Sequence, residues 1–300
     1  MTIKPSRLKQ GDGVGVIAPA GPITQSEIQP GISLLESSGF KVFVSSHLYD
    51  RQGYLAGDDH SRLSDLHAMF QEDRVRAIFC ARGGYGTMRL FNRINFELIR
   101  RNPKIIMGYS DITALLLAIY EKADLMTFHG PVITDLSKDD HRNFESFLSL
   151  VSSDGMTTAS LSGGRVIKPG KAKGILLGGN LSLICYLVGT PFMPSLKGAI
   201  LFVEERGEPL YRLDRMLTYL RLCGVLEHCA GLIAGGFEEC GDQPSVDQLL
   251  ADRISDLDVP VLSGLPIGHG LENIALPIGA QAVLDTEKMT LSTTEPCVNP

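Results

Sequence analysis

The sequence predicts an α/β protein with an N-terminal doubly wound domain, built on a parallel sheet, and a C-terminal α/β domain that is richer in strands. Short apolar runs without alternation are separated by helical patterns in the first half of the chain, which is typical of a parallel sheet covered on both faces. The 300 residues, of which 44% are hydrophobic and 21% charged, are enough for two globular domains.

The N-terminal domain is expected to span residues 1–135 and to alternate strands with helices. Its strands are expected at residues 13–18, 41–44, 76–81 and 104–108. Helical patterns lie between and after them, in a stretch that ends near residues 38–39 and then at 61–70 and 111–121.

The second half of the chain is expected to contain a linker and the C-terminal domain. Residues 136–173 are polar with little periodicity, so we interpret them as a linker with one short helix, and residues 174–300 as the domain. A helix is expected at residues 211–222. Strands are expected at residues 174–177, 199–203, 231–234 and 259–262, with 282–284 and 289–291 as a closing antiparallel pair.

Charge and composition argue against several classes of partner and cofactor. A net charge of −6 argues against nucleic acid. The longest apolar run, residues 114–120, is far shorter than the roughly 20 residues that cross a bilayer. No apolar segment follows the first residues as in a signal peptide, so we expect a cytoplasmic protein. The six cysteines form no C-x-x-C pair, and we expect neither a metal site, a cofactor nor a disulfide framework.

The strongest local signal for chemistry surrounds Ser110, in the segment Met107–Thr113. An expected buried strand leads directly into Ser110, and a helix begins immediately after it. Such a turn exposes a serine hydroxyl at the edge of the sheet, beside the N–H groups of the helix N-terminus. The spacing is not G-x-S-x-G, because Ile112 stands at the second glycine position. Ser110 is therefore either a nucleophile or simply the N-cap of its helix.

A glycine-rich loop, Arg82–Gly86, also follows an expected strand and precedes a helix. Its backbone N–H groups can bind an anion or an oxyanion, or the loop can be no more than a tight turn. No Gly-Lys-Ser/Thr sequence follows, so it is not a P-loop. In a doubly wound sheet this loop and Ser110 lie at the same, ligand-binding edge.

Histidines and acids at strand ends complete the set of candidates. His269 lies between two glycines, which suits an exposed general base, and His129 is its rival. Glu204 and Glu205 follow a strand, where a carboxylate can orient a histidine or form a solvated acidic turn. Strand parity sends these two carboxylates to opposite faces without showing which face matters. For each histidine alone, a structural role is the simpler interpretation.

Taken together, these segments resemble the LD-carboxypeptidase family, the muramoyltetrapeptide carboxypeptidases of bacterial cell-wall recycling. The similarity runs almost from end to end and consists of motifs in the family's order. These motifs are Val16–Gly21, Ala81–Gly86, Gly108–Asp111, Leu177–Leu181, Gly189–Pro191, Leu201–Glu205 with Glu208–Arg212, and Gly268–Gly270 with Leu276–Gly279.

The resemblance implies a Ser-His-Glu triad. Ser110 matches the nucleophile, Glu204 the orienting carboxylate and His269 the base. It also implies that the backbone N–H groups of Gly84 and Asp111 form the oxyanion hole. The chain departs from the family at one point, since Glu205 stands where an aspartate often follows the triad glutamate.

The activity implied by the resemblance is that of a metal-free serine carboxypeptidase, which releases the terminal D-alanine from murein tetrapeptides at an L-to-D bond. Arg82 and Gly83 are the candidate substrate-binding residues, with Arg82 as the candidate cation for the terminal carboxylate, although the sequence does not show the direction of its side chain. The family also implies a homodimer. A related Ser-His-Glu hydrolase of peptidyl or aminoacyl nucleotide antibiotics, of the immunity type, is the alternative. A two-lobed binding protein without chemistry is a further alternative, but the sequence lacks an export signal and supplies a nucleophile.

Overall fold

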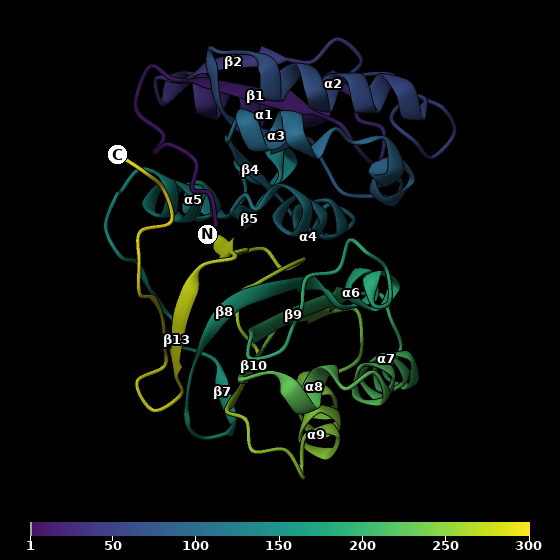
Figure 1. The fold of residues 1–300 in the computed structure, drawn as a ribbon, viewed down its shortest axis with the longest axis vertical. Helices are drawn as coiled ribbons and strands as arrows, with labels where there is room; N and C mark the ends of the chain where they lie inside the picture. The colour runs from purple at the N-terminus through teal and green to yellow at the C-terminus, as the bar shows by residue number, and fades with distance from the viewer. Residues whose placement is uncertain (1) are drawn as a thin grey trace.

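The computed structural model describes residues 2–300, which form two α/β halves, each built on one sheet (Figure 1). The first sheet has the order β12-β5-β4-β3-β1-β2, and all of its strands are parallel except the edge strand β12. The strands are β1 (Gly13–Ile17), β2 (Lys41–Val44), β3 (Val75–Cys80), β4 (Ile105–Gly108), β5 (Thr127–His129) and β12 (Leu276–Ile278).

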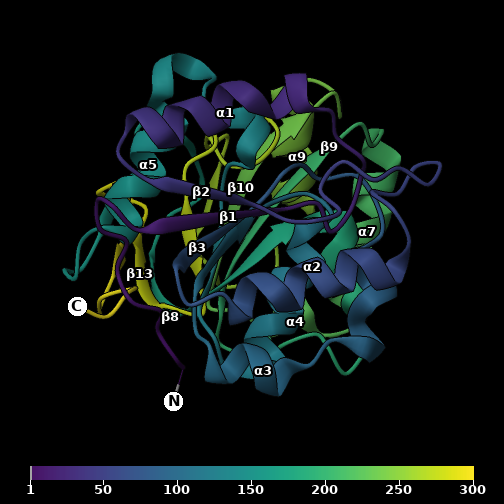
Figure 2. The same cartoon turned by 90° about the horizontal axis from the view of Figure 1, so that it is seen from above.

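Helices cover both faces of the first sheet, as Figure 2 shows from above, so the predicted doubly wound arrangement is confirmed. Successive strand residues enter opposite cores: Val16 packs on one side of β1 and Ile17 on the other. Strands buried on both faces have no need for alternation, which explains the uninterrupted apolar runs. One face carries α1 (Gln25–Ser37) and α5 (Arg142–Val151), and the other α2 (Asp59–Gln71), α3 (Phe96–Arg101) and α4 (Ile112–Ala123).

The second sheet is mixed and has the order β6-β14-β13-β8-β9-β10-β11-β7. Its four middle strands β8 to β11 are parallel, and antiparallel strands flank them on both sides. The strands are β6 (Thr158–Ser160), β7 (Arg165–Lys168), β8 (Lys171–Asn180), β9 (Ile200–Arg206), β10 (Gly231–Glu238), β11 (Val261–Ser263), β13 (Gln281–Asp285) and β14 (Thr290–Thr293). The expected antiparallel pair at the end of the chain is β13 and β14.

Helix ends follow the local sequence. Asp58 precedes α2 and accepts a hydrogen bond from the Ser61 N–H at 2.7 Å, and Asp242 does the same for Ser245 at 2.8 Å before α9 (Gln243–Arg253). A side-chain cap of this kind stabilises a helix by about 1 kcal/mol. The remaining helices are α6 (Leu181–Leu187), α7 (Leu210–Leu222) and α8 (Val225–His228), with the 3₁₀ turns η1 (Thr87–Arg93), η2 (Ile133–Asp135) and η3 (Asp139–His141).

The segment 136–173, interpreted from the sequence as a linker with one short helix, contains more structure than expected. The short helix is α5, but β6, β7 and the start of β8 also lie in this segment and join the second sheet. These strands are short and carry exposed polar residues, because they lie at or near the sheet edges. The predicted domain boundaries at residues 135 and 173 stay predictions.

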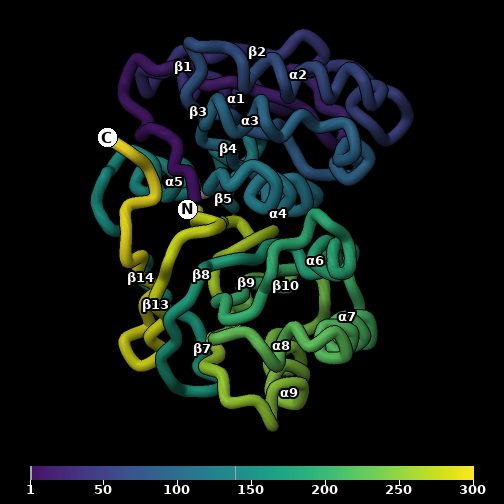
Figure 3. Tube along the Cα trace, viewed as in Figure 1, coloured from purple at the N-terminus to yellow at the C-terminus, as the bar shows by residue number. Residues whose placement is uncertain are grey.

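The two halves are joined by more than one crossing of the chain. Strand β12 comes from the C-terminal third yet pairs with β5 at the edge of the first sheet. The last residues return to the first half, where the Asn299 N–H donates to the Pro5 carbonyl at 2.8 Å, and Figure 3 traces this return in yellow. No helix within residues 2–300 is long and apolar enough to span a membrane.

Candidate active site

Ser110 occupies a strained turn at the carboxyl end of β4. Its φ angle is +63°, a left-handed conformation that costs a residue with a side chain roughly 1–2 kcal/mol. The N-cap of α4 is Asp111, and within residues 2–300 the Ser110 side chain makes no capping hydrogen bond. The capping interpretation of Ser110 therefore does not fit the structure. Positive-φ serines in a strand-to-helix turn are typical of nucleophiles.

The glycine-rich loop packs directly against Ser110. A Cβ on Gly83 would lie 2.8 Å from Ser110 Cβ and 2.9 Å from its Oγ, so only glycine permits this approach. Gly84 has a φ of +123° and is exposed. Within residues 2–300, neither the Gly84 nor the Asp111 backbone N–H donates a hydrogen bond. Gly84 and Asp111, each with an N–H group that is free to donate, thus line the same part of the cleft as the serine.

The Asp111 side chain ties the serine turn to the glycine-rich loop. Its Oδ2 accepts from the Thr87 N–H at 2.9 Å, and the Thr87 hydroxyl donates to the Asp111 carbonyl at 2.8 Å. Burial raises the pKa of Asp111, against the lowering effect of the Thr87 hydrogen bonds. These two hydrogen bonds therefore fix Asp111 against the residue that follows the glycine-rich loop.

His269 and Glu204 form a hydrogen-bonded pair on the opposite side of the cleft. His269 Nδ1 lies 2.6 Å from Glu204 Oε2, and the Glu204 side chain is fully buried in β9. Gly268 has a φ of +111°, and a Cβ there would overlap the Glu204 carboxylate. This close approach explains why a glycine must precede the histidine. The pair leaves the His269 Nε2 available to a reacting group.

Burial and mutual charge set the protonation behaviour of this pair. Burial raises the pKa of Glu204, and the hydrogen bond from His269 opposes that rise. Burial lowers the pKa of His269, but the hydrogen bond to Glu204 and the charges of Glu204 and Glu205 outweigh it, so the pKa of His269 is raised. A histidine of this kind is a stronger base than a free imidazole.

Glu205 points to the other face of β9 and makes no hydrogen bond to the imidazole, although both residues line the same part of the cleft. Its carboxylate accepts from Asn180 Nδ2 and from the Ser182 N–H, each at 2.8 Å. It thereby caps the start of α6, where Asn180 is the N-cap. Strand parity alone does not choose between the two glutamates, and the structure places Glu204 beside His269.

His129 is fully buried beneath the cleft and does not line it. Its ring packs edge-on against Phe202 at 5.1 Å and against Tyr109 at 6.1 Å, and Tyr109 in turn meets the His269 ring at 4.8 Å. Burial and the nearby His269 lower the pKa of His129 to about 3, so it is neutral near pH 7. It supports the site as an aromatic ring, without access to substrate.

Ser110 and His269 face a cleft with two adjoining parts. Both residues line both parts, although no hydrogen bond joins them within residues 2–300. The first part, about 480 Å³, is lined by three cationic side chains and two carboxylates: Arg82, Lys138, Arg206, Glu27 and Asp135. The second, about 510 Å³, shares Arg206 and is otherwise lined by apolar, polar and acidic side chains. Within residues 2–300, no three His, Cys, Asp or Glu side chains converge as a metal site would require.

Two family models match this chain. The model of the LD-carboxypeptidase N-terminal domain matches residues 14–130, and that of the C-terminal domain matches residues 173–284. The chain belongs to the LD-carboxypeptidase family. It is thus a member of a serine peptidase family of hydrolases.

Relatives of this family member include two kinds of protein. It is 42% identical to the "Probable murein peptide carboxypeptidase" of Bacillus subtilis (strain 168), over 97% of this chain and 94% of that protein. It is 27% identical to the "Microcin C7 self-immunity protein MccF" of Escherichia coli, over 96% and 94%. Among solved structures, the muramoyltetrapeptide carboxypeptidase from Oxalobacter formigenes superimposes with a TM-score of 0.84, at 30% identity, covering 93% of this chain and 97% of that one.

The structure of this family member brings the predicted site residues to one cleft. Ser110, His269, Gly83, Gly84 and Arg82 line the cleft, and the fully buried Glu204 lies behind His269. Sequence reasoning missed two buried asparagines near the histidine, Asn143 and Asn273. No local pattern marks them as parts of a site. Asn180 lay in a quoted motif, and its position between a strand and a helix is a recognisable N-cap signal.

Proposed function

We propose that this family member is a serine carboxypeptidase that releases the terminal D-alanine from murein tetrapeptides through Ser110, His269 and Glu204. The observation that carries the proposal is the buried Glu204–His269 pair, which faces a strained serine across one cleft. The family relationship and the two murein carboxypeptidase relatives support the choice of substrate.

The reaction starts when the Ser110 Oγ attacks the carbonyl carbon between the diamino acid and D-alanine. His269 Nε2 accepts the hydroxyl proton, and Glu204 stabilises the resulting imidazolium. The tetrahedral oxyanion accepts hydrogen bonds from the Gly84 and Asp111 N–H groups. One such donor typically contributes on the order of 3 kcal/mol to the transition state.

The intermediate collapses when the C–N bond breaks and His269 donates its proton to the amine of the departing D-alanine. Water then attacks the acyl–Ser110 ester, with His269 accepting one of its protons. Breakdown of the second tetrahedral intermediate frees the shortened peptide and restores the Ser110 hydroxyl. The activation of serine by a histidine requires no metal ion.

The first part of the cleft, where cations outnumber carboxylates, suits the terminal carboxylate of the substrate. Arg82 lines it and is 45% exposed in its side chain, with its nearest carboxylate, Glu27, 3.9 Å away. Lys138 is already engaged by Asp135 at 2.7 Å. We assign the carboxylate to Arg82, with Gly83 forming the wall between it and the serine. A homodimer, which the family resemblance implies, and a cytoplasmic location, which the sequence leads us to expect, remain proposals.

A competing-substrate assay tests the proposed function. Purified enzyme is incubated with a murein tetrapeptide ending in D-alanine, with the same peptide ending in L-alanine, and with an aminoacyl nucleotide. We expect release from the first peptide only, unchanged by EDTA. The relationship to the immunity protein favours the aminoacyl nucleotide as the second candidate. Cleavage of that compound alone would overturn the peptidase proposal.

A further inference from the structure

The position of the catalytic pair depends on how the two halves of the molecule are joined. Ser110 follows β4 in the first sheet, whereas His269 lies in the loop between β11 and β12. Because no hydrogen bond joins them within residues 2–300, other contacts must set their separation. Helix α5 touches both sides of this junction.

One side of α5 is anchored in the first half of the protein. Phe144 and Phe147 are buried in the core that also contains Phe79 of β3, and the Phe79 and Phe147 rings lie 4.7 Å apart. The glycine-rich loop against Ser110 begins soon after the end of β3. The helix and the serine are therefore parts of one packed unit.

The N-terminal turn of α5 holds the histidine loop through the buried amide of Asn143. Its Oδ1 accepts from the Asn273 N–H at 2.7 Å, and its Nδ2 donates to the carbonyls of Leu271 at 3.1 Å and Asp135 at 3.2 Å. Asn143 is 1% exposed, so water cannot replace a hydrogen-bond partner that its amide loses. The amide thus bridges the two halves.

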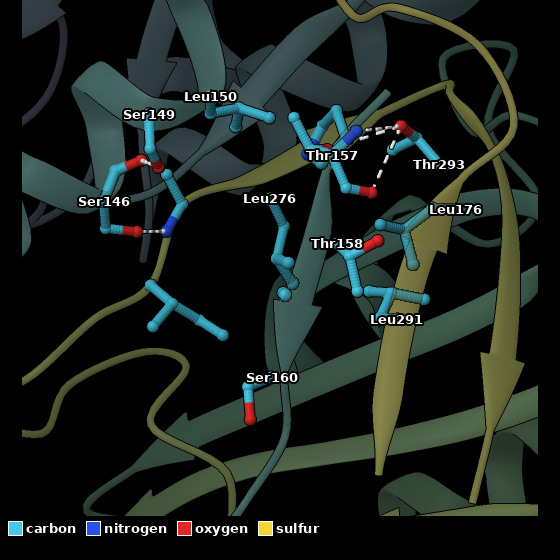
Figure 4. A pocket seen from close by; sticks show the side chains of 14 residues that line it. Ser146, Ser149, Leu150, Thr157, Thr158, Ser160, Leu176, Leu276, Leu291 and Thr293 are labelled. Carbon is cyan, nitrogen blue, oxygen red and sulfur yellow. Dashed lines mark hydrogen bonds between the residues drawn. The ribbon is translucent and has the colours of Figure 1, made fainter. Parts of the chain in front are cut away.

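A second bond from α5 and one inside the loop complete the connection. The Ser146 hydroxyl accepts from the Ala275 N–H at 2.8 Å, at the edge of a cavity of about 190 Å³ that Figure 4 shows. The Asn273 side chain then accepts from the Gly268 N–H at 2.8 Å. Gly268 precedes His269 and lies against Glu204. An unbroken series of hydrogen bonds therefore runs from Asn143 to the residue before the histidine.

We propose that Asn143 is a positioning residue, which sets the place of His269 relative to Ser110 through Asn273. The proposal rests on the proposed triad but not on the identity of the substrate. A displacement of about 1 Å between reacting groups can cost on the order of 100-fold in rate. Substitution of Asn143 should therefore lower kcat and leave KM much less affected.

The test compares Asn143→Ala with Glu145→Ala, an exposed position two residues along the same helix. For Asn143→Ala we expect a fall in kcat of roughly 10- to 100-fold, by the same positioning argument, with KM changed by less than about threefold. The Glu145→Ala control should match the wild type. Melting temperatures show whether each variant is folded at the assay temperature.

An NMR titration of the His269 imidazole measures its pKa, which should stay unchanged if Asn143 only stabilises the fold. A loosened loop weakens the contact with Glu204, so the pKa of His269 should fall in Asn143→Ala. The titration uses no substrate. If the enzyme releases no D-alanine, the proposed function is refuted, but the titration still tests the positioning role of Asn143. A folded Asn143→Ala with wild-type kcat, or with an unchanged His269 titration, overturns the positioning role. If that variant does not fold, Asn143→Asp replaces it. Aspartate keeps the acceptor for the Asn273 N–H but loses the donor to the Leu271 carbonyl, so a smaller fall in kcat is expected, and an unchanged kcat overturns the proposal.

Discussion

Replacement of Glu204 by glutamine keeps the size of the side chain and removes its charge. That charge is unscreened, because the side chain is 0% exposed. Oε2 lies 2.6 Å from His269, and Oε1 has no hydrogen-bond partner within residues 2–300. The carboxylate charge of Glu204 therefore acts mainly on the His269 imidazole. An amide in place of a triad carboxylate costs roughly 10⁴-fold in kcat, which corresponds to about 5.4 kcal/mol of transition-state stabilisation.

The pH profile gives the same prediction a second readout. His269 acts as a base only when it is neutral, so activity declines as pH falls through its pKa. Burial alone lowers that pKa, and the hydrogen bond to Glu204 and the carboxylate charges raise it above its ordinary value. In Glu204→Gln the raising contribution of Glu204 is lost, so the acid limb of kcat/KM should move to lower pH.

The assay is the rate of D-alanine release from a murein tetrapeptide between about pH 5 and 9, the range in which a histidine titrates. Glu205→Gln is the matched comparison, because this neighbouring carboxylate contacts Asn180 and Ser182 instead of the imidazole. Its loss of rate should be much smaller than that of Glu204→Gln. A Glu204→Gln enzyme within about tenfold of the wild-type rate, with an unmoved acid limb, would refute the assigned role.

Other substitutions test separate parts of the site. Arg82→Ala should raise KM about tenfold, equivalent to roughly 1.4 kcal/mol of binding, with a smaller change in kcat; an unchanged KM means that the carboxylate binds elsewhere. Gly268→Ala should lower both melting temperature and activity, because alanine at its φ of +111° is strained and its Cβ would overlap Glu204. Gly270→Ala is its control, since the nearest atom to a Cβ there is 3.4 Å away; equal effects of the two substitutions would contradict the steric argument.

Much of the fold could be predicted because strand and helix signals are local. The uninterrupted runs Gly13–Ala18 and Lys104–Gly108 predicted the parallel sheet, since strands covered on both faces need no alternation. The strands β6 and β7 were missed, because short strands at or near a sheet edge are polar and resemble loops. Helix α9 was also missed, although Asp242 followed by Pro244 is a start signal for a helix.

Some residues of the candidate site could likewise be predicted from local sequence signals, and others could not. Ser110 and the glycine-rich loop could be placed together because both follow strands of one parallel sheet. The pairing of His269 with Glu204 came from a family resemblance, since 65 residues separate them and no local pattern joins them. Asn143 could not be recognised at all, because the backbone groups that it bonds in the histidine loop are about 130 residues away.

The proposed mechanism depends on Ser110 as the nucleophile of a carboxypeptidase reaction. The most direct test measures D-alanine released from a murein tetrapeptide, by mass, with wild-type protein and with Ser110→Ala of unchanged melting temperature. We expect release by the wild type and none above background by the variant. Release by the variant at a rate near that of the wild type would contradict this mechanism.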